Sequence, residues 1–253
     1  MSISHISNTN LSNAYRNMSS GKRINSAADD AAGLAQAERM EAQQRSMKAG
    51  ANNVASAQDA SKIQDGALGN ITDSLQRMRE LGVQAQNGLL SQSDRDAIQA
   101  EVNQLAQGIG DIAGQTNYNT KNLLDGTGGS MQISMGQGGD TELTTNDATL
   151  SGLGLTNLDV SSASFLDDID GVLEKLDGMR ASGGAQFNGF EHAYNNLNVG
   201  RTNTVASYSR KVDQDMGAGM TEIKKQQSLQ QYQMKLKKNM MDNRASQAKA
   251  LFS

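Results

Sequence analysis

The sequence predicts a mainly α-helical protein, in which a long antiparallel helical rod or coiled coil forms from both chain ends around a small β-hairpin region in the middle. Apolar residues make up only 36% of the 253 residues and aromatic residues 4%, and the chain contains no Pro. Globular domains usually have about 45–50% apolar residues, counting Gly. Apolar residues also recur at alternating spacings of three and four, which is typical of helices that pack along a seam.

Composition and motifs indicate no catalytic, cofactor or metal site. The absence of Cys excludes disulfides, Cys-ligated zinc and a cysteine nucleophile, and only two histidines, His5 and His192, are present. No HExxH motif, P-loop or nucleophile elbow occurs. A net charge of −4 gives no reason to expect nucleic acid as a partner. No run of about 18 apolar residues predicts a membrane span, and the first residues do not resemble a signal peptide.

The first 33 residues predict a short helix and an irregular link. Leu11, Ala14 and Met18 recur at helical spacing within residues 1–20. Small residues and turn formers follow over residues 21–33. Three of these can cap the N-terminus of the next helix: Ser26, Asp29 and Asp30.

A long helix is predicted over about 34–88. Its heptad seam comprises Leu68, Ile71, Leu75, Met78, Gly82, Ala85 and Leu89. The same seam continues upstream through Met47, Gly50, Val54, Ala57 and Ser61. Because most of these side chains are small, we expect a partner helix to approach closely there.

A second helix is predicted over about 94–113, with Asp94 as its cap. Its seam comprises Ile98, Val102, Leu105, Ile109 and Ile112. The short loop before it predicts that this helix folds back antiparallel on the first. Gly inside a helix costs about 1 kcal/mol relative to Ala, so we also expect close packing at Gly82 and Gly110.

Residues from about 125 to 164 predict one or two β-hairpins, because eight Gly fall between 126 and 154 and residues 131–135 alternate in polarity. Asp140 lies among these glycines, but the spacing favours a turn over a calcium loop. This middle region is acidic: residues 126–190 carry 2 basic and 9 acidic groups, whereas residues 191–253 carry 10 basic and 5 acidic groups.

Helical spacing returns over about 165–213, through Ile169, Val172, Leu176, Met179 and Gly183 and then Phe190, Tyr194, Leu197, Arg201, Thr204 and Tyr208. The acidic residues near 167–170 suit the start of this helix. The last segment, 214–253, is amphipathic and rich in Lys and Met. Its apolar positions are Met220, Ile223, Leu229, Tyr232, Leu236 and Met240.

One short stretch combines charge with an apolar residue outside the seam. Met78 lies in the seam, but Arg77, Arg79, Glu80 and Leu81 do not. Leu81 is therefore expected on a polar face, beside Arg77 and opposite a returning helix that bears Glu101. Two interpretations remain open: a singly exposed Leu, which is common, or part of a contact between subunits.

Several ordered blocks resemble bacterial flagellin. They are residues 18–35 (MSSGKRINSAADDAAGLA), 75–87 (LQRMRELGVQAQN), 91–101 (SQSDRDAIQAE), 117–126 (NYNTKNLLDG), 184–191 (GAQFNGFE) and 195–198 (NNLN), with a looser match at 209–216. The resemblance covers nearly the whole chain except about 127–165. It implies a short form with the inner D0 and surrounding D1 regions only, without the outer D2 and D3 domains.

The resemblance implies a structural filament subunit for swimming motility, secreted unfolded through the flagellar type III apparatus into an extracellular filament, with no enzymatic activity. The implied domains are 1–25 as the N-terminal D0 segment, 26–213 as the D1 rod and 214–253 as the C-terminal D0 helix. Leu11, Met18, Met220, Ile223, Leu229, Leu236 and Met240 would then serve D0 assembly.

The implied partners are further copies of the chain, an export chaperone at the C-terminal segment, and hook-junction and cap proteins. Where the organism meets an animal host, the resemblance also implies recognition by Toll-like receptor 5. The positions implied for subunit contact and receptor recognition are Gln76, Arg77, Arg79, Glu80, Leu81, Ile98 and Glu101.

Two alternatives remain. The stretch before Met18 is shorter than in typical members, and the tail carries Lys235, Lys237 and Lys238 where members mostly have Ala, Gln and Leu. These departures leave open a basic inner tube or a minor subunit that polymerises poorly alone. The first alternative is therefore a minor or hook–filament junction subunit, although junction proteins usually have Pro where Ala31 stands. The second alternative is a cytosolic coiled-coil scaffold.

Overall fold

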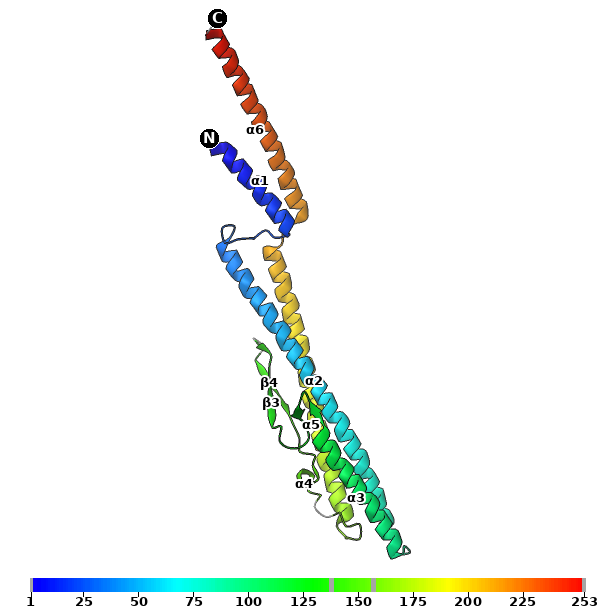
Figure 1. The fold of residues 1–253 in the computed structure, drawn as a ribbon. Helices are drawn as coiled ribbons and strands as arrows, with labels where there is room; N and C mark the ends of the chain where they lie inside the picture. Colours follow the sequence, from blue (N-terminus) through cyan, green and yellow to red (C-terminus); the bar gives the residue numbers. More distant parts are fainter. Residues whose placement is uncertain (1, 137–138, 156–157, 252–253) are drawn as a thin grey trace. The chain divides into compact units, whose positions relative to one another are not determined.

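The fold is mainly helical, as the sequence predicts. In a computed structural model that describes residues 2–136, 139–155 and 158–251, long helices come from both chain ends (Figure 1). Two small antiparallel strand pairs come from the middle of the sequence. The chain divides into two compact units. One contains the residues up to Gln44 together with those from Thr202 onward, and the other contains Arg45–Arg201.

The long helices begin and end within a few residues of the expected positions. They are α1 (Ser2–Ser20), α2 (Ala31–Ala85), α3 (Gln92–Gln115), α5 (Phe165–Val212) and α6 (Met216–Leu251). Because α2 ends before the predicted residue 88, Leu89 lies in the following turn with 93% of its surface exposed. Its predicted place in the seam is therefore wrong.

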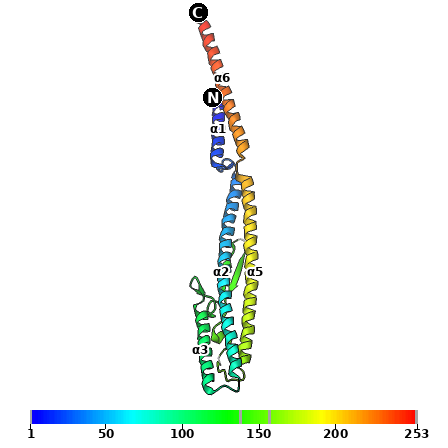
Figure 2. The same cartoon turned by 90° about the vertical axis from the view of Figure 1, so that its right-hand side faces the viewer.

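The core of the second unit comes from the predicted seams of α2, α3 and α5. Figure 2 shows α3 alongside α2, to which it returns after a short turn. The buried side chains include Val54, Leu68, Ile71, Leu75, Met78, Ile98, Val102, Ile109, Ile169, Val172, Leu176, Phe190 and Leu197. Each helix buries one face. Side chains from the segment between α3 and α5, among them Leu124, Leu143 and Leu155, belong to the same core, so no single helix builds it.

Gly50 and Gly82 of α2 both mark close approaches to the rest of the second unit, but only one of them involves another helix. A Cβ atom at Gly82 would lie 2.6 Å from the ring of Phe165 in α5, as the sequence predicts. At Gly50 the close neighbour is instead the main chain of Met135, after a β-strand. The predicted close packing at Gly110 is wrong for the single chain, because nothing in the described structure lies within 4 Å of a Cβ built there.

A β-hairpin forms within the expected region. β3 (Ser130–Ser134) pairs antiparallel with β4 (Asp140–Thr144), with Ser130 opposite Thr144. The expected hairpin range also includes residues 137–138 and 156–157, which lie outside the described residues. The hairpin is fixed to α2, because the Asn53 side chain donates a hydrogen bond of 2.9 Å to the Ser134 carbonyl.

Three small elements were not expected from the sequence. β1 (Asn117–Tyr118) pairs with β2 (Lys121–Asn122) just after α3, and α4 (Leu150–Leu153) follows the hairpin. The first pair closes through a turn in which Asn119 and Thr120 both have positive φ. Two-residue strands give too few alternating positions to be recognised from sequence periodicity.

The start of α3 differs from the prediction in one residue. Ser91, not Asp94, is the N-cap: its hydroxyl accepts a hydrogen bond from the Asp94 N–H at 3.2 Å. The Asp94 carboxylate accepts one from the Ser91 N–H at 3.0 Å. This reciprocal capping box lowers the pKa of Asp94, because the Ser91 hydroxyl and N–H both favour the charged carboxylate.

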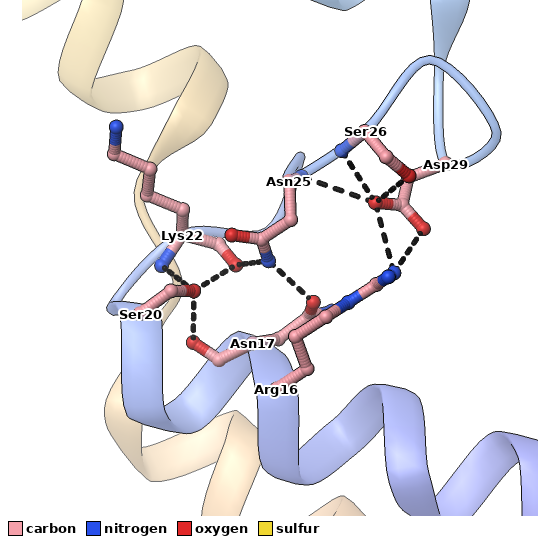
Figure 3. A network of polar contacts seen from close by, with 7 residues as sticks. All are labelled: Arg16, Asn17, Ser20, Lys22, Asn25, Ser26 and Asp29. Atoms are coloured by element: carbon pink, nitrogen blue, oxygen red, sulfur yellow. Dashed lines mark hydrogen bonds and ion pairs between the residues drawn. The ribbon is translucent and has the colours of Figure 1, made fainter.

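In the first unit, polar contacts order the link between α1 and α2 (Figure 3). Asp29 accepts hydrogen bonds from the backbone N–H groups of Asn25 and Ser26, at 3.1 and 2.9 Å, and pairs with Arg16 of α1 at 2.9 Å. These donors, with the Asn25 N–H foremost, lower the pKa of Asp29. Asp30 caps α2 by accepting a hydrogen bond from the Gly33 N–H at 2.8 Å.

The same link is joined to the break between α5 and α6. The Arg23 N–H donates to the Val212 carbonyl at 2.6 Å, and the Gln214 N–H donates to the Gly21 carbonyl at 2.9 Å. Lys22 and Asp213 face each other in this short antiparallel bridge. The two places where terminal helices begin or end are thus hydrogen-bonded to each other.

Candidate assembly surfaces

An exposed ion-pair cluster joins α2 to α3. Arg77 of α2 pairs with Glu101 of α3 at 2.9 Å and with Glu80 of its own helix at 3.0 Å. Glu101 and then Glu80, by accepting its hydrogen bonds, raise the pKa of Arg77. The structure therefore brings together Arg77 and Glu101, which the sequence places on facing helices. Gln76 is exposed on the adjoining turn.

A second ion pair, which sequence analysis missed, joins α2 to α5. Arg79 donates to the Asp170 carboxylate at 2.6 Å, and this hydrogen bond lowers the pKa of Asp170. The sequence indicated only that Asp170 belongs to an acidic helix start. Its partner lies 91 positions away, and helical periodicity alone does not identify it.

The prediction that Leu81 lies on a polar face is wrong. Leu81 is only 2% exposed and belongs to the same core cluster as Ile98, which is also buried. Residues that contact α3 and residues that contact α5 together make the buried face of α2 wider than a single coiled-coil seam. Of the seven positions implied for subunit contact, Leu81 and Ile98 are therefore buried in the core. The other five side chains are exposed: Gln76, Arg77, Arg79, Glu80 and Glu101.

The terminal helices present a different kind of surface. α1 and α6 pack together, with Met18 beside Gly219 and the Gln227 amide donating to the Tyr15 hydroxyl at 2.6 Å. Leu11 and Met18 are half-buried in this pair. The buried apolar side chains among the described residues of this unit are Ile24, Ala37, Val212 and Ile223.

Beyond Ile223, α6 carries an apolar stripe that stays exposed among the described residues. We call Leu229, Tyr232, Leu236 and Met240 the α6 stripe; they recur at spacings of three and four, which places them on one helix face. Leu229 is 45% and Leu236 49% exposed, whereas Ile223 is 5% exposed. None of the side chains that the structure describes between 224 and 247 is buried. Met220 is exposed as well.

The described residues contain no cluster of His, Asp and Glu able to hold a metal ion. His192 lies exposed on α5. Within the described residues, no helix is long and apolar enough to cross a membrane.

Comparison with known proteins supplies the family. The profile of the bacterial flagellin N-terminal helical region matches residues 1–128, and that of the C-terminal helical region matches residues 166–242. The chain belongs to the bacterial flagellin family. Its relatives include the flagellar filament 33 kDa core protein of Treponema phagedenis, with 36% identity over 89% of this chain and 87% of the relative. A flagellin of Halalkalibacterium halodurans has 35% identity over 86% of this chain and 83% of the relative.

Solved structures agree with this assignment. The flagellin of Bacillus cereus is 31% identical, with a TM-score of 0.53 over 58% of this chain and 88% of that protein. A putative flagellar hook-associated protein from Vibrio parahaemolyticus has a TM-score of 0.51 over 72% of this chain and 95% of that protein, at 15% identity. The second likeness concerns the fold alone, so it does not separate a filament subunit from a junction subunit.

Proposed function

We propose that this flagellin is a structural subunit that polymerises into a flagellar filament by burying the α6 stripe, together with α1, against neighbouring copies. The observation that carries the proposal is the long run of α6 that buries no described side chain. Helical stability in proteins comes mostly from packing of an apolar face. Leu229 and Leu236 are each about half exposed, so covering the remainder contributes roughly 1 kcal/mol per side chain. Covering the stripe therefore stabilises both the helix and the polymer.

The proposed domain division follows the breaks between helices. Residues 1–25 and 214–253 form the inner D0 region, and residues 26–213 form D1. The link after Ser20 and the break after Val212 support these boundaries, because α1 and α6 lie beyond them. The hydrogen bonds between link and break keep the two D0 segments together.

A second contact between subunits is proposed at the exposed part of the Arg77 surface, which comprises Gln76, Arg77, Arg79, Glu80 and Glu101. Four of these side chains, all except Gln76, take part in ion pairs. Arg77 pairs with Glu80 of its own helix and with Glu101 of α3, and Arg79 pairs with Asp170 of α5, so the positions of these charges are restricted before any partner arrives. A pre-ordered charged surface binds at a lower entropic cost than free side chains do. The same surface is the proposed recognition site for animal Toll-like receptor 5 where the organism meets such a host.

The proposal also covers export of the subunit and its partners. The chain is exported by the flagellar type III apparatus and functions outside the cell, in contact with hook-junction and cap proteins. Before export, a chaperone covers the C-terminal segment; the exposed α6 stripe supports this, because apolar surface of this kind favours association. The chain acts without catalysis, cofactor, membrane or nucleic acid.

The test is negative-stain electron microscopy of the purified chain after addition of ammonium sulfate, which strengthens apolar burial. Long filaments of uniform width are expected. Monomers or short oligomers only, at every salt concentration, would contradict self-sufficient assembly and favour a minor or junction subunit that needs another protein. A chain that remained inside the expressing bacterium in the presence of a complete export apparatus would instead favour the cytosolic scaffold.

A further inference from the structure

The turn between α2 and α3 contains one of two Asn–Gly pairs in the chain, Asn87–Gly88. The other pair, Asn188–Gly189, lies inside α5. Both asparagines are exposed. The two pairs therefore share the same chemistry and differ in their backbone surroundings.

The Asn87 side chain is held as an electrophile. Its amide oxygen Oδ1 accepts a hydrogen bond from the Leu89 N–H at 3.0 Å. This donor withdraws electron density from the side-chain carbonyl carbon Cγ, and it would stabilise negative charge on Oδ1 if a nucleophile attacked there.

The hydrogen bonds of the Asn87–Gly88 peptide group favour the Gly88 nitrogen as the nucleophile. The Asn87 main-chain carbonyl accepts hydrogen bonds from the Leu90 N–H at 3.2 Å and from Arg95 Nη2 at 3.3 Å. When the Gly88 N–H loses its proton, the charge spreads onto this carbonyl oxygen, so both donors favour the deprotonated form. Within the described residues the Gly88 N–H makes no hydrogen bond, and no atom outside residues 87–89 lies within 4 Å of where a Gly88 Cβ would be.

The pair in α5 lacks these conditions. The Gly189 N–H lies in the middle of a helix and donates to the carbonyl four residues earlier. Attack by this nitrogen on Asn188 therefore requires local opening of the helix, which has a free-energy cost.

We propose that Asn87 is a site of spontaneous intramolecular deamidation. The Gly88 nitrogen forms a bond to Asn87 Cγ, the Cγ–Nδ2 bond breaks, and Nδ2 leaves as ammonia with the proton that Gly88 gave up. The product is a cyclic imide. Water then adds across one of the two imide C–N bonds and gives aspartate or isoaspartate, so the net change is replacement of an amide by a carboxylate.

The modification changes the turn in two ways. The net charge of the chain goes from −4 to −5, and the new carboxylate lies near Arg95, whose guanidinium already reaches residue 87. Isoaspartate also adds a main-chain carbon immediately before the Ser91–Asp94 capping box. Deamidation thus changes the charge and the backbone of the turn between α2 and α3.

The experiment incubates the full chain in mildly alkaline buffer prepared with ¹⁸O water. Tryptic peptides 80–95 and 181–201 are then followed by mass spectrometry with fragmentation, and isoaspartate is labelled with an isoaspartyl methyltransferase. Asn87 is expected to convert at least about tenfold faster than Asn188 in the folded chain. In urea, the two sites are expected to convert at similar rates. Arg95→Gln should slow Asn87 severalfold, whereas Arg39→Gln, an exposed arginine elsewhere on α2, should not. Because Arg95→Gln removes the tryptic cleavage site after residue 95, the peptide followed in that variant is 80–121.

Two results would overturn the proposal. One is equal rates at Asn87 and Asn188 in the folded chain while both convert in urea. The other is an unchanged Asn87 rate in Arg95→Gln, which would show that the turn geometry does not promote the reaction. Circular dichroism of each variant checks that the helices are intact, and Asn87→Gln, whose longer side chain disfavours the five-membered ring, gives the background rate.

Discussion

Gly50 of α2 faces the main chain of Met135 so closely that a Cβ atom at residue 50 would lie 2.7 Å from the Met135 carbonyl carbon. The hairpin end therefore packs on α2 through a position that only Gly fits. The neighbouring Asn53 adds the hydrogen bond to Ser134. Together these contacts fix the β3–β4 hairpin on the helix.

Gly50→Ala is expected to lower the free energy of unfolding by roughly 1–3 kcal/mol, because backbone must move to admit the methyl group. Gly66→Ala is the matched control in the same helix, since nothing lies within 4 Å of its Cβ position. It should raise stability by about 0.5–1 kcal/mol through helix propensity. Urea unfolding followed by circular dichroism measures both. Equal effects of the two substitutions would show that the hairpin does not rest on Gly50.

Ser91→Ala is expected to lower the free energy of unfolding by about 1 kcal/mol, because it removes the hydroxyl of the α3 capping box. Ser93→Ala, in the first turn of the same helix, serves as the control and should change stability by no more than about 0.5 kcal/mol. Chemical denaturation of both variants distinguishes the outcomes. A larger loss at Ser93 would contradict Ser91 as the N-cap.

The link between α1 and α2 is expected to be acid-sensitive, because the Asp29 carboxylate accepts its hydrogen bonds in the charged form. Its pKa is lowered from the ordinary value of 3.8, chiefly by the Asn25 N–H and then by the Ser26 donors and Arg16. A lowered carboxylate pKa stabilises the fold above the ordinary value, and the stabilisation is lost as the pH falls through the lowered pKa. The protection of amide hydrogens in residues 21–30, measured relative to the intrinsic exchange rate at each pH, should therefore fall as the pH drops below 3.8. Asp29→Asn should show the faster exchange already at neutral pH, and unchanged exchange there would refute this role.

A charge swap on the Arg77 surface distinguishes an effect on the stability of the single chain from an effect on subunit binding. Exposed ion pairs contribute little to stability, so Arg77→Glu combined with Glu101→Arg should leave the thermal unfolding midpoint nearly unchanged. The same swap reverses the charges presented to a neighbouring subunit. Filament growth seeded with wild-type fragments, measured by light scattering, is expected to slow. Wild-type growth rates with the swapped chain would place the subunit contact elsewhere.

The sequence predicted the helices and most of the core because those depend on local periodicity. The seams through Leu68 and Ile109 are buried as expected. Leu81 was misplaced because a heptad pattern describes one partner helix, whereas α2 is covered on two sides. Leu89 was misplaced because an apolar residue at heptad spacing carries no information about the helix having ended at Ala85.

The surface contacts were only partly predictable. Arg77 and Glu101 could be paired because a short turn fixes the register between α2 and α3. Arg79 and Asp170 could not, since the intervening hairpin region leaves the register between α2 and α5 open in the sequence. The α6 stripe was visible as apolar positions, but its exposure in the single chain follows only from the structure.

The most direct measurement of the central claim is salt-induced filament formation by the double variant Leu229→Ser with Leu236→Ser, scored by electron microscopy. Its matched control is Val199→Ser, an exposed apolar residue of α5 outside the terminal helices. Circular dichroism of the monomers checks that residues 45–201 remain folded. The account predicts that the double variant forms no long filaments whereas the control assembles like the wild type. Normal filaments from the double variant would contradict burial of the α6 stripe as the basis of assembly.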